Sequence, residues 1–336
     1  MSQTKKFSQA PSNTQLDSGF DRWRTYVEYT AAPSDLMHRL PNFFIIGAMK
    51  AATSSLHDQL AALDGVFMSD PKELYFFSDD PVYDNGLDWY ADHFRAAAPD
   101  DIVGESTTHY AKLPTYPDTI DRLDAAIENP RFIYVMRHPI DRLLSQYTHM
   151  WLEREVTVSF HEAIEGAVPE LVDYSRYSYQ LEPYFERFGA DRVLPVFVDR
   201  LRSHGSAELD RVSSFIGLDR TVAWDDDIDA NNVSAERLQQ SNLRDGIKKL
   251  PGYERLRELA PEATIERLRD RWRPSDRPTL TPDQLATVTE VLDADLERLG
   301  SWLGIELNVA TFSETTGGLD SPTWQPSVLD TYPGPT

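Results

Sequence analysis

The chain has 336 residues, of which 40% are hydrophobic and 11% aromatic, and it contains no cysteine. This is enough for one sizeable core, and the lack of cysteine excludes disulfides, thiolate metal sites and a cysteine nucleophile. The formal net charge of −22 argues against binding to nucleic acid or anionic lipid, because both need basic surface. A site for a polyanionic ligand would have to be a local basic island.

The organisation expected along the chain is simple. No stretch reaches the roughly 18 uninterrupted apolar residues of a membrane helix, and the N-terminus has no apolar secretory core, so we expect no membrane span and a cytoplasmic protein. Residues 1–38 are expected to be a polar extension that can form one short helix, 39–310 a single domain, and 311–336 a loose tail rich in Ser, Thr, Gly and Pro. The oligomeric state stays open.

The first motif begins with the apolar run 43–46, which is typical of a strand buried on both faces of a parallel sheet. Leu56, Leu60 and Leu63 recur at helical spacing behind it, so residues 47–53 are predicted to form a strand-to-helix turn. Such a turn binds anions, because unpaired N–H groups and the positive end of the helix dipole converge there.

The residues of this turn that are expected to bind an anion are Lys50, Ala51, Ala52, Thr53, Ser54 and Ser55. Lys50 adds a full positive charge, and the hydroxyl groups add donors. The turn is not a Walker A loop, because Lys50 comes only three residues after Gly47 and has no glycine directly before it.

A second strand-turn-helix segment follows further along the chain. The apolar run 132–136 predicts a strand, and Pro139 suits the first turn of the next helix. Arg137 at the strand end and Ser145 two helical turns later are expected to reach one phosphate. The alternative is that Arg137 pairs with Asp141 and that Ser145 is an ordinary surface residue.

The two motifs together resemble the 5′-phosphosulfate loop and the 3′-phosphate motif of sulfotransferases that use 3′-phosphoadenosine 5′-phosphosulfate (PAPS), above all the heparan-sulfate-type branch and its bacterial relatives. The family loop is roughly Ile-x-Gly-x-x-Lys-Gly-Gly-Thr-x-x-Leu, and residues 45–56 match it except at Ala51 and Ala52. Alanine permits the same close backbone approach provided that φ is negative. Further matches are Arg137, Pro139, Ser145, Tyr147, Tyr177, Tyr184 and Phe188, and the likeness covers residues 41–218.

The resemblance implies an α/β fold with a P-loop-like parallel sheet flanked by helices, and the C-terminal region is expected to be helical. It implies PAPS as the donor, no metal, and a 3′-phosphate site made by Arg137, Ser145 and Tyr177. Arg273, beside Trp272, is expected to close over the nucleotide, although basic residues favoured at a helix end are an equal alternative.

Sulfuryl transfer needs a base for the acceptor's proton and a cation for the charge that develops on the leaving phosphate. Lys50 is the expected cation. Relatives carry Gly-Glu-x-Ser-Pro-x-Tyr with the Glu as base, which corresponds here to Glu105, with Thr108 in place of the proline. His109 is the rival base, because imidazole titrates near neutral pH.

Lys72 and Glu73 resemble the family's Lys-Glu-x-x-Phe-Phe element, which would offer Lys72 to the sulfate or the acceptor. The alternative is a surface ion pair before an aromatic strand. The sequence therefore predicts an enzyme that transfers the sulfuryl group in line from PAPS to a hydroxyl or amine of a small-molecule, lipid or glycan acceptor. The alternatives are a P-loop nucleotide kinase or phosphotransferase, and a non-catalytic binding protein with the nucleotide fold.

Overall fold

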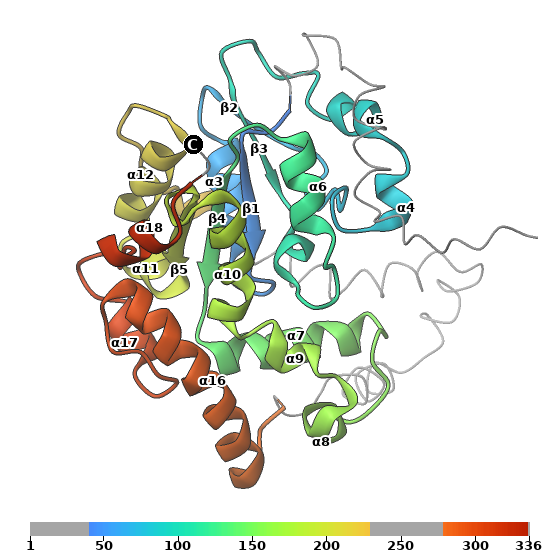
Figure 1. The fold of residues 1–336 in the computed structure, drawn as a ribbon, viewed down its shortest axis with the longest axis vertical. Helices are drawn as coiled ribbons and strands as arrows, with labels where there is room; N and C mark the ends of the chain where they lie inside the picture. The colour runs from blue at the N-terminus through green and yellow to red at the C-terminus, as the bar shows by residue number, and fades with distance from the viewer. Residues whose placement is uncertain (1–39, 229–277, 335–336) are drawn as a thin grey trace, which may run out of the picture. The chain divides into compact units, whose positions relative to one another are not determined.

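The computed structural model describes residues 40–228 and 278–334. A five-stranded parallel sheet lies at the centre of this part (Figure 1). The strands are β1 (Phe43–Gly47), β2 (Val66–Met68), β3 (Ile102–Ser106), β4 (Arg131–Met136) and β5 (Val193–Phe197), in the spatial order β2-β3-β1-β4-β5. Because the strands are parallel, their carboxyl ends share one edge of the sheet.

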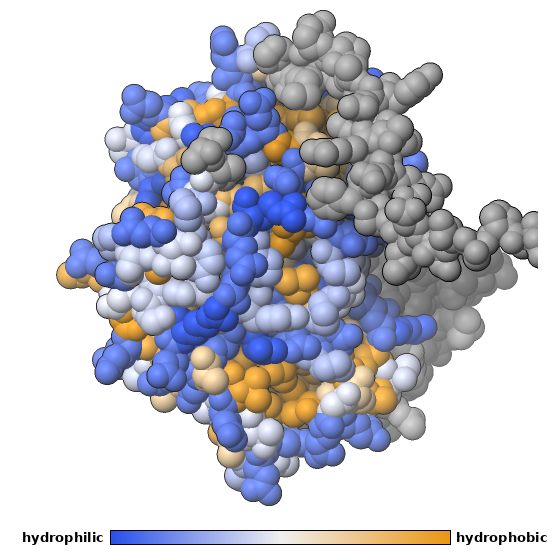
Figure 2. Space-filling model, viewed as in Figure 1, coloured by the Kyte–Doolittle hydropathy of each residue, from blue (hydrophilic) through white to orange (hydrophobic). Residues whose placement is uncertain are grey.

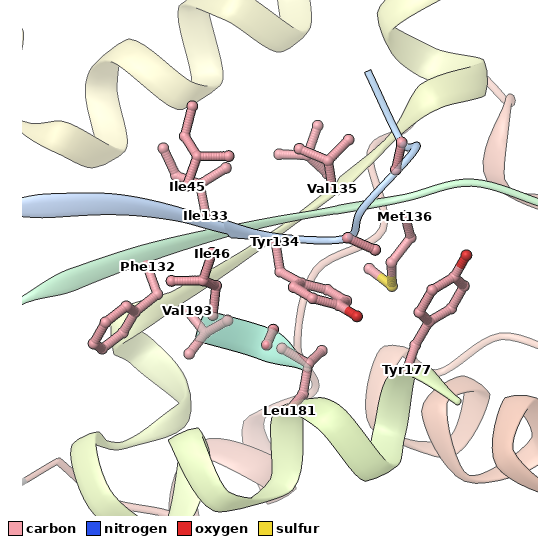
Figure 3. Close-up of a cluster of buried hydrophobic side chains, with 14 of the residues drawn as sticks. Ile45, Ile46, Phe132, Ile133, Tyr134, Val135, Met136, Tyr177, Leu181 and Val193 are labelled. Atoms are coloured by element: carbon pink, nitrogen blue, oxygen red, sulfur yellow. The ribbon is translucent and has the colours of Figure 1, made fainter. Parts of the chain in front are cut away.

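The central strands are buried on both faces, as their continuous apolar runs predict. Figure 3 shows Ile45, Ile133 and Val135 on one side of the sheet, and Phe132 and Tyr134 on the other, facing α10 (Tyr177–Phe188). This alternation is the two-residue period of a strand.

Helices cover both faces of the sheet. One group includes α3 (Thr53–Ala61) and α12 (Gly205–Ile216), which contact each other, and a second includes α6 (Thr119–Ala126), α10 and α16 (Pro282–Leu303). The remaining elements are α4 (Asp80–Tyr83), α5 (Leu87–Asp92), η1 (Thr108–Ala111), α7 (Pro139–Leu152), α8 (Phe160–Glu162), η2 (Ala163–Ala167), α9 (Glu170–Asp173), η3 (Ala190–Arg192), α11 (Val198–Ser203), α17 (Phe312–Thr316) and α18 (Pro326–Thr331). The predicted α/β class, with a parallel sheet flanked by helices and a helical C-terminal region, is confirmed.

Strand β3 approaches β1 unusually closely at Gly104. A Cβ atom there would lie 2.1 Å from Cζ of Phe43, so only glycine leaves room for this ring. The close packing sets the position of Glu105, the next residue along the strand. The face seen in Figure 2 is largely hydrophilic, with apolar residues gathered in its lower part. None of the helices that the structure describes is long and apolar enough to cross a membrane.

The C-terminal segment differs from the loose tail that its composition predicts. Phe312, Trp324 and Val328 are buried, and Nε1 of Trp324 donates a 2.6 Å hydrogen bond to the carbonyl of Val193 in β5. The guanidinium of Arg200 donates to the backbone of residues 318 and 319. A few large apolar side chains suffice to dock a segment that is otherwise small and polar. The expected N-terminal extension lies outside the described residues.

Candidate functional site

The predicted site residues converge on the carboxyl edge of the sheet. Lys50 follows β1, Glu105 lies near the end of β3, and Arg137 follows β4, and these three strands are neighbours. The turn after β1 is tied to β4, because Nη1 of Arg137 donates to the carbonyl of Lys50 at 3.3 Å. The two motifs that are far apart in the sequence therefore form one continuous site.

The turn after β1 is shaped by two residues in the left-handed conformation, Lys50 with φ 66° and Ala52 with φ 57°. Ala52 precedes α3, and its side chain cannot cap the helix. The N–H of Leu56 makes the 3.2 Å bond to the carbonyl of Ala52 that starts the helix, so the N–H groups of residues 53–55 lie ahead of the helical ladder. A turn of this kind directs N–H donors at an anion.

This conformation corrects one expectation, because φ at Ala52 is positive rather than negative. Ala51, by contrast, is not among the residues with positive φ, and its side chain is fully buried. The hydroxyl-bearing residues of the turn also differ in burial: Thr53 is buried, Ser55 is half-buried and Ser54 is exposed.

Arg137 carries an unsatisfied donor. Its side chain is 22% exposed, Nη2 lies 3.9 Å from a carboxylate oxygen of Asp141, and Nε is buried with no hydrogen-bond partner among the residues that the structure describes. The pair with Asp141 that the sequence left as an alternative is therefore present, but it uses only one end of the guanidinium. A buried donor without an acceptor is unfavourable, so this group suits an anionic ligand.

Tyr177 lies directly beside Arg137, the residue with which it was expected to act. Its side chain is fully buried, and its hydroxyl donates to the carbonyl of Arg137 and lies 3.4 Å from the N–H of the same residue. Tyr177 therefore holds the backbone of Arg137 in place, and its contact with a 3′-phosphate stays a prediction. Ser145 is half-buried on α7.

Arg142 was missed by the sequence analysis. Its guanidinium is fully buried and donates to Ser175 Oγ at 2.7 Å, to Gln146 Oε1 at 2.8 Å, and to the carbonyls of Leu171 at 2.7 Å and Met49 at 3.5 Å. All four acceptors are neutral, and burial lowers the pKa of Arg142. A buried positive charge thus lies next to the anion-binding turn, and the one available signal was an arginine on the apolar side of a helix.

Glu105 is at the predicted edge of the sheet, but its side chain is 0% exposed. The carboxylate accepts hydrogen bonds from the hydroxyls of Tyr90, Thr107 at 2.6 Å and Tyr110 at 2.9 Å. Burial raises the pKa of Glu105 to about 7. The three hydroxyl donors enclose the carboxylate and link β3 to α5 through Tyr90, and Glu105 as the base stays a prediction.

Glu73 lies at the same edge and is more accessible. Its side chain is 20% exposed, Oε1 contacts Nζ of Lys72, and Oε2 accepts the N–H of Thr108 at 2.8 Å. The backbone of Glu73 is left-handed with φ 61°, and its N–H donates to the carbonyl of Ser106 at 2.9 Å. The Lys72–Glu73 element is therefore an ion pair, as one alternative expected, and it also lies at the site.

His109 is held from three sides. Its Nδ1 lies 3.0 Å from Oδ2 of Asp79, and its ring contacts those of Tyr75 and Tyr116 with centroid distances of 4.3 and 4.4 Å. Burial lowers the pKa of His109, which favours the neutral ring. The imidazole of His109 is thus, in addition to the carboxylate of Glu73, a group that can accept a proton.

Two further expectations concerned Arg273 and a metal ion. Arg273 lies outside the described residues. Within 40–228 and 278–334, no group of three or more His, Asp and Glu side chains is arranged to hold a metal ion.

Comparisons with known proteins agree with the fold and the motifs. Residues 82–226 match the model of the sulfotransferase family. The chain is 32% identical over 139 residues to the membrane-associated sulfotransferase kil1 of Dictyostelium discoideum, which covers 40% of this chain and 28% of that protein. It is 31% identical over 192 residues to heparan sulfate glucosamine 3-O-sulfotransferase 3B1 of Mus musculus, which covers 55% of this chain and 48% of that protein.

Among solved structures, a sulfotransferase from Alicyclobacillus acidocaldarius superposes with a TM-score of 0.57 at 20% identity, over 80% of this chain and 97% of that one. This likeness concerns the fold. The chain spans less than half the length of the curated relatives named above. Residues 82–226 are therefore similar to the sulfotransferase family, and the two motifs at the sheet edge and these relatives support a likeness to its PAPS-dependent members.

Proposed function

We propose that the protein is an enzyme that transfers the sulfuryl group of PAPS to a hydroxyl or amine of an acceptor. The observation that carries this proposal is the joined anion site, in which the turn after β1 contacts Arg137 after β4 and a buried Arg137 donor has no partner within the described part of the chain. Two anion-binding features on neighbouring strands suit a ligand with two separate anionic groups better than they suit a single phosphate.

The residues present fit this donor. The N–H groups of residues 53–55 and the Lys50 ammonium would hold the 5′-phosphosulfate, and Arg137 with Ser145 would hold the 3′-phosphate. When bound, PAPS supplies a sulfuryl group on a phosphate that leaves with negative charge. Lys50 stabilises that charge, and the buried charge of Arg142 adds positive potential from the far side of the turn.

The base in this proposal is Glu73 instead of Glu105. Glu73 has exposed surface and an oxygen near the exposed edge, whereas Glu105 has neither. Lys72 contacts Glu73, and the Glu73 carboxylate takes the acceptor's proton in this proposal. The acceptor is proposed to be a small molecule, lipid or glycan, and the heparan sulfate relatives make a sugar hydroxyl or amine one candidate.

The experiment is a calorimetric titration with 3′-phosphoadenosine 5′-phosphate (PAP), with ATP plus magnesium as the control ligand. Arg137→Ala is expected to weaken PAP binding by about 10- to 100-fold, because a hydrogen bond to a charged group contributes about 1.5–3 kcal/mol. Arg131→Ala is the matched control, since Arg131 begins the strand that Arg137 follows and lies at the opposite edge. Preference for ATP, or no PAP binding, would overturn the proposal.

A further inference from the structure

The side chain of Lys112 is largely buried at this site, while its ammonium keeps some solvent-accessible surface. It follows η1 and comes three residues after His109, and it is only 7% exposed. Within the part of the chain that the structure describes, its ammonium has no hydrogen-bond acceptor and no carboxylate at ion-pair distance. It lies over the ring of Tyr174 at 5.7 Å from the centroid. Lysine is rarely buried to this extent unless it is paired.

The fold itself gains little from this charge. Burial of most of the side chain disfavours its charged form and lowers the pKa of Lys112 to about 8. An apolar side chain of the same length would fill the space without that cost. A destabilising group kept at the edge of the sheet is typical of a binding site.

Lys112 lies beside the chemistry proposed above. Lys112 directly follows η1, whose first residue, Thr108, donates its N–H to Oε2 of Glu73 at 2.8 Å. Glu73 has the largest electrostatic influence in favour of the charged form of Lys112, and Arg142 opposes that form. Lys112 in turn lowers the pKa of His109, which places the two side chains within electrostatic reach of each other. An oxyanion bound to Lys112 would therefore belong to a molecule whose reactive group is close to Glu73.

The surroundings favour a small molecule over a polymer. The whole chain has a net charge of −22, so an extended polyanion would be repelled. The rings of Tyr75, His109 and Tyr116 contact one another in a continuous aromatic group. Aromatic side chains pack well against the ring of a sugar or a phenol.

We propose that the acceptor is a small hydroxylated ring compound with one oxyanion, a carboxylate or a sulfate ester, and that Lys112 binds this oxyanion. This inference rests on the proposed function. It assigns the charge of the acceptor and the residue that selects it.

The test uses the full-length protein saturated with PAP and titrated with matched pairs of ligands. The pairs are glucuronate with glucose, 4-hydroxybenzoate with 4-hydroxybenzamide, and glucose 6-sulfate with glucose, with a heparin hexasaccharide as the polymer arm. The carboxylate and sulfate arms distinguish the two kinds of oxyanion. In at least one pair, the anionic member is expected to bind about tenfold more tightly than its neutral partner.

Three variants test whether Lys112 causes the tighter binding of the anionic ligands. Lys112→Met should abolish it, Lys112→Arg should retain it, and Arg95→Met should leave it unchanged, because Arg95 is exposed and its nearest carboxylate, on Asp92, is 3.9 Å away. Lys112→Met should also raise the melting temperature, since it removes the charge of a largely buried side chain, whereas a purely structural lysine would give a lower one.

The inference would be overturned if the anionic and neutral members of all three pairs bound with equal affinity, or if neither member bound. It would also be overturned if Lys112→Met still bound the anionic member more tightly, or if that variant had a lower melting temperature. Tighter binding of the heparin hexasaccharide than of any small acid would overturn it as well. PAP binding is measured first. Its absence would refute the proposed function, whereas PAP binding with parity within the pairs would refute the acceptor inference alone.

Discussion

The two halves of the site use different chemical groups, backbone groups in one and side chains in the other. The half formed by the turn after β1 and by Arg137 depends on backbone: left-handed residues, the start of α3 and a carbonyl that joins the two motifs. The half formed by residues 72–75 and 105–112 depends on charged and aromatic side chains. Its properties follow from which of these are buried, and by what.

The difference shows which features of a site are local. Backbone donors at a helix start are presented by the few residues around them, so a short motif specifies them. The burial of a carboxylate depends on distant segments. Tyr90 in α5 and Tyr110 in η1 enclose Glu105, while Glu73 on the neighbouring loop keeps exposed surface.

The largest expected effect distinguishes Glu73 from Glu105, the two carboxylates in the half of the site formed by residues 72–75 and 105–112, which we call the acceptor half. Glu73→Gln should lower the rate of acceptor-dependent PAP release by about 10²- to 10⁴-fold, because it removes the proton-accepting group. Its affinity for PAP, measured by calorimetry, should be unchanged, because the donor half is separate. Glu105→Gln should keep much more activity, and Glu128→Gln, at an exposed position, should keep all of it. An equal loss in Glu73→Gln and Glu105→Gln would remove the distinction between them.

The second expected effect is a change with pH in the free energy of unfolding, which follows from the burial of Glu105. The pKa of Glu105 is about 7 in the folded protein against an ordinary value of 4.5. Between these values the folded state keeps a proton that the unfolded state releases, so this group's contribution to stability falls as pH rises from 4.5 to 7.

Relative to Glu105→Gln, the parent should therefore lose on the order of 3 kcal/mol of unfolding free energy over that range, at about 1.36 kcal/mol per pKa unit. Denaturant unfolding of both proteins between pH 4.5 and 8 measures the difference. A difference independent of pH would mean that Glu105 is already ionised at low pH, and its place as a buried structural group would then be wrong.

The smallest effect concerns the backbone of the donor half. Ala52→Gly should leave stability unchanged or raise it by up to about 1 kcal/mol, because the left-handed strain it relieves slightly exceeds the added flexibility of the unfolded chain. Ala51→Gly should lower stability by about 0.5–1 kcal/mol, since this residue is buried and has no positive φ. Thermal unfolding of both variants measures the contrast, and equal effects at the two positions would contradict it.

The fold was largely predictable, because uninterrupted apolar runs such as 43–46 and 132–136 form strands only where both faces are covered. The two strand-turn-helix segments at Lys50 and Arg137 were also predictable from their sequence patterns, and the structure joins them. The sign of φ at Ala52 was not, since alanine adopts either conformation when tertiary contacts hold it. The packed C-terminal segment was also missed, because its anchor, Trp324, binds β5 about 130 residues away.

The sequence by itself determined the strands of the parallel sheet and the turn between β1 and α3, because each of these elements depends on residues that are close together in the chain. Only the tertiary structure decided that Glu105 is enclosed, that Tyr177 supports Arg137, and that Arg142 and Lys112 are buried cations. Exposure and pKa depend on the groups packed around a side chain, and those groups come from segments that the order of residues does not bring together.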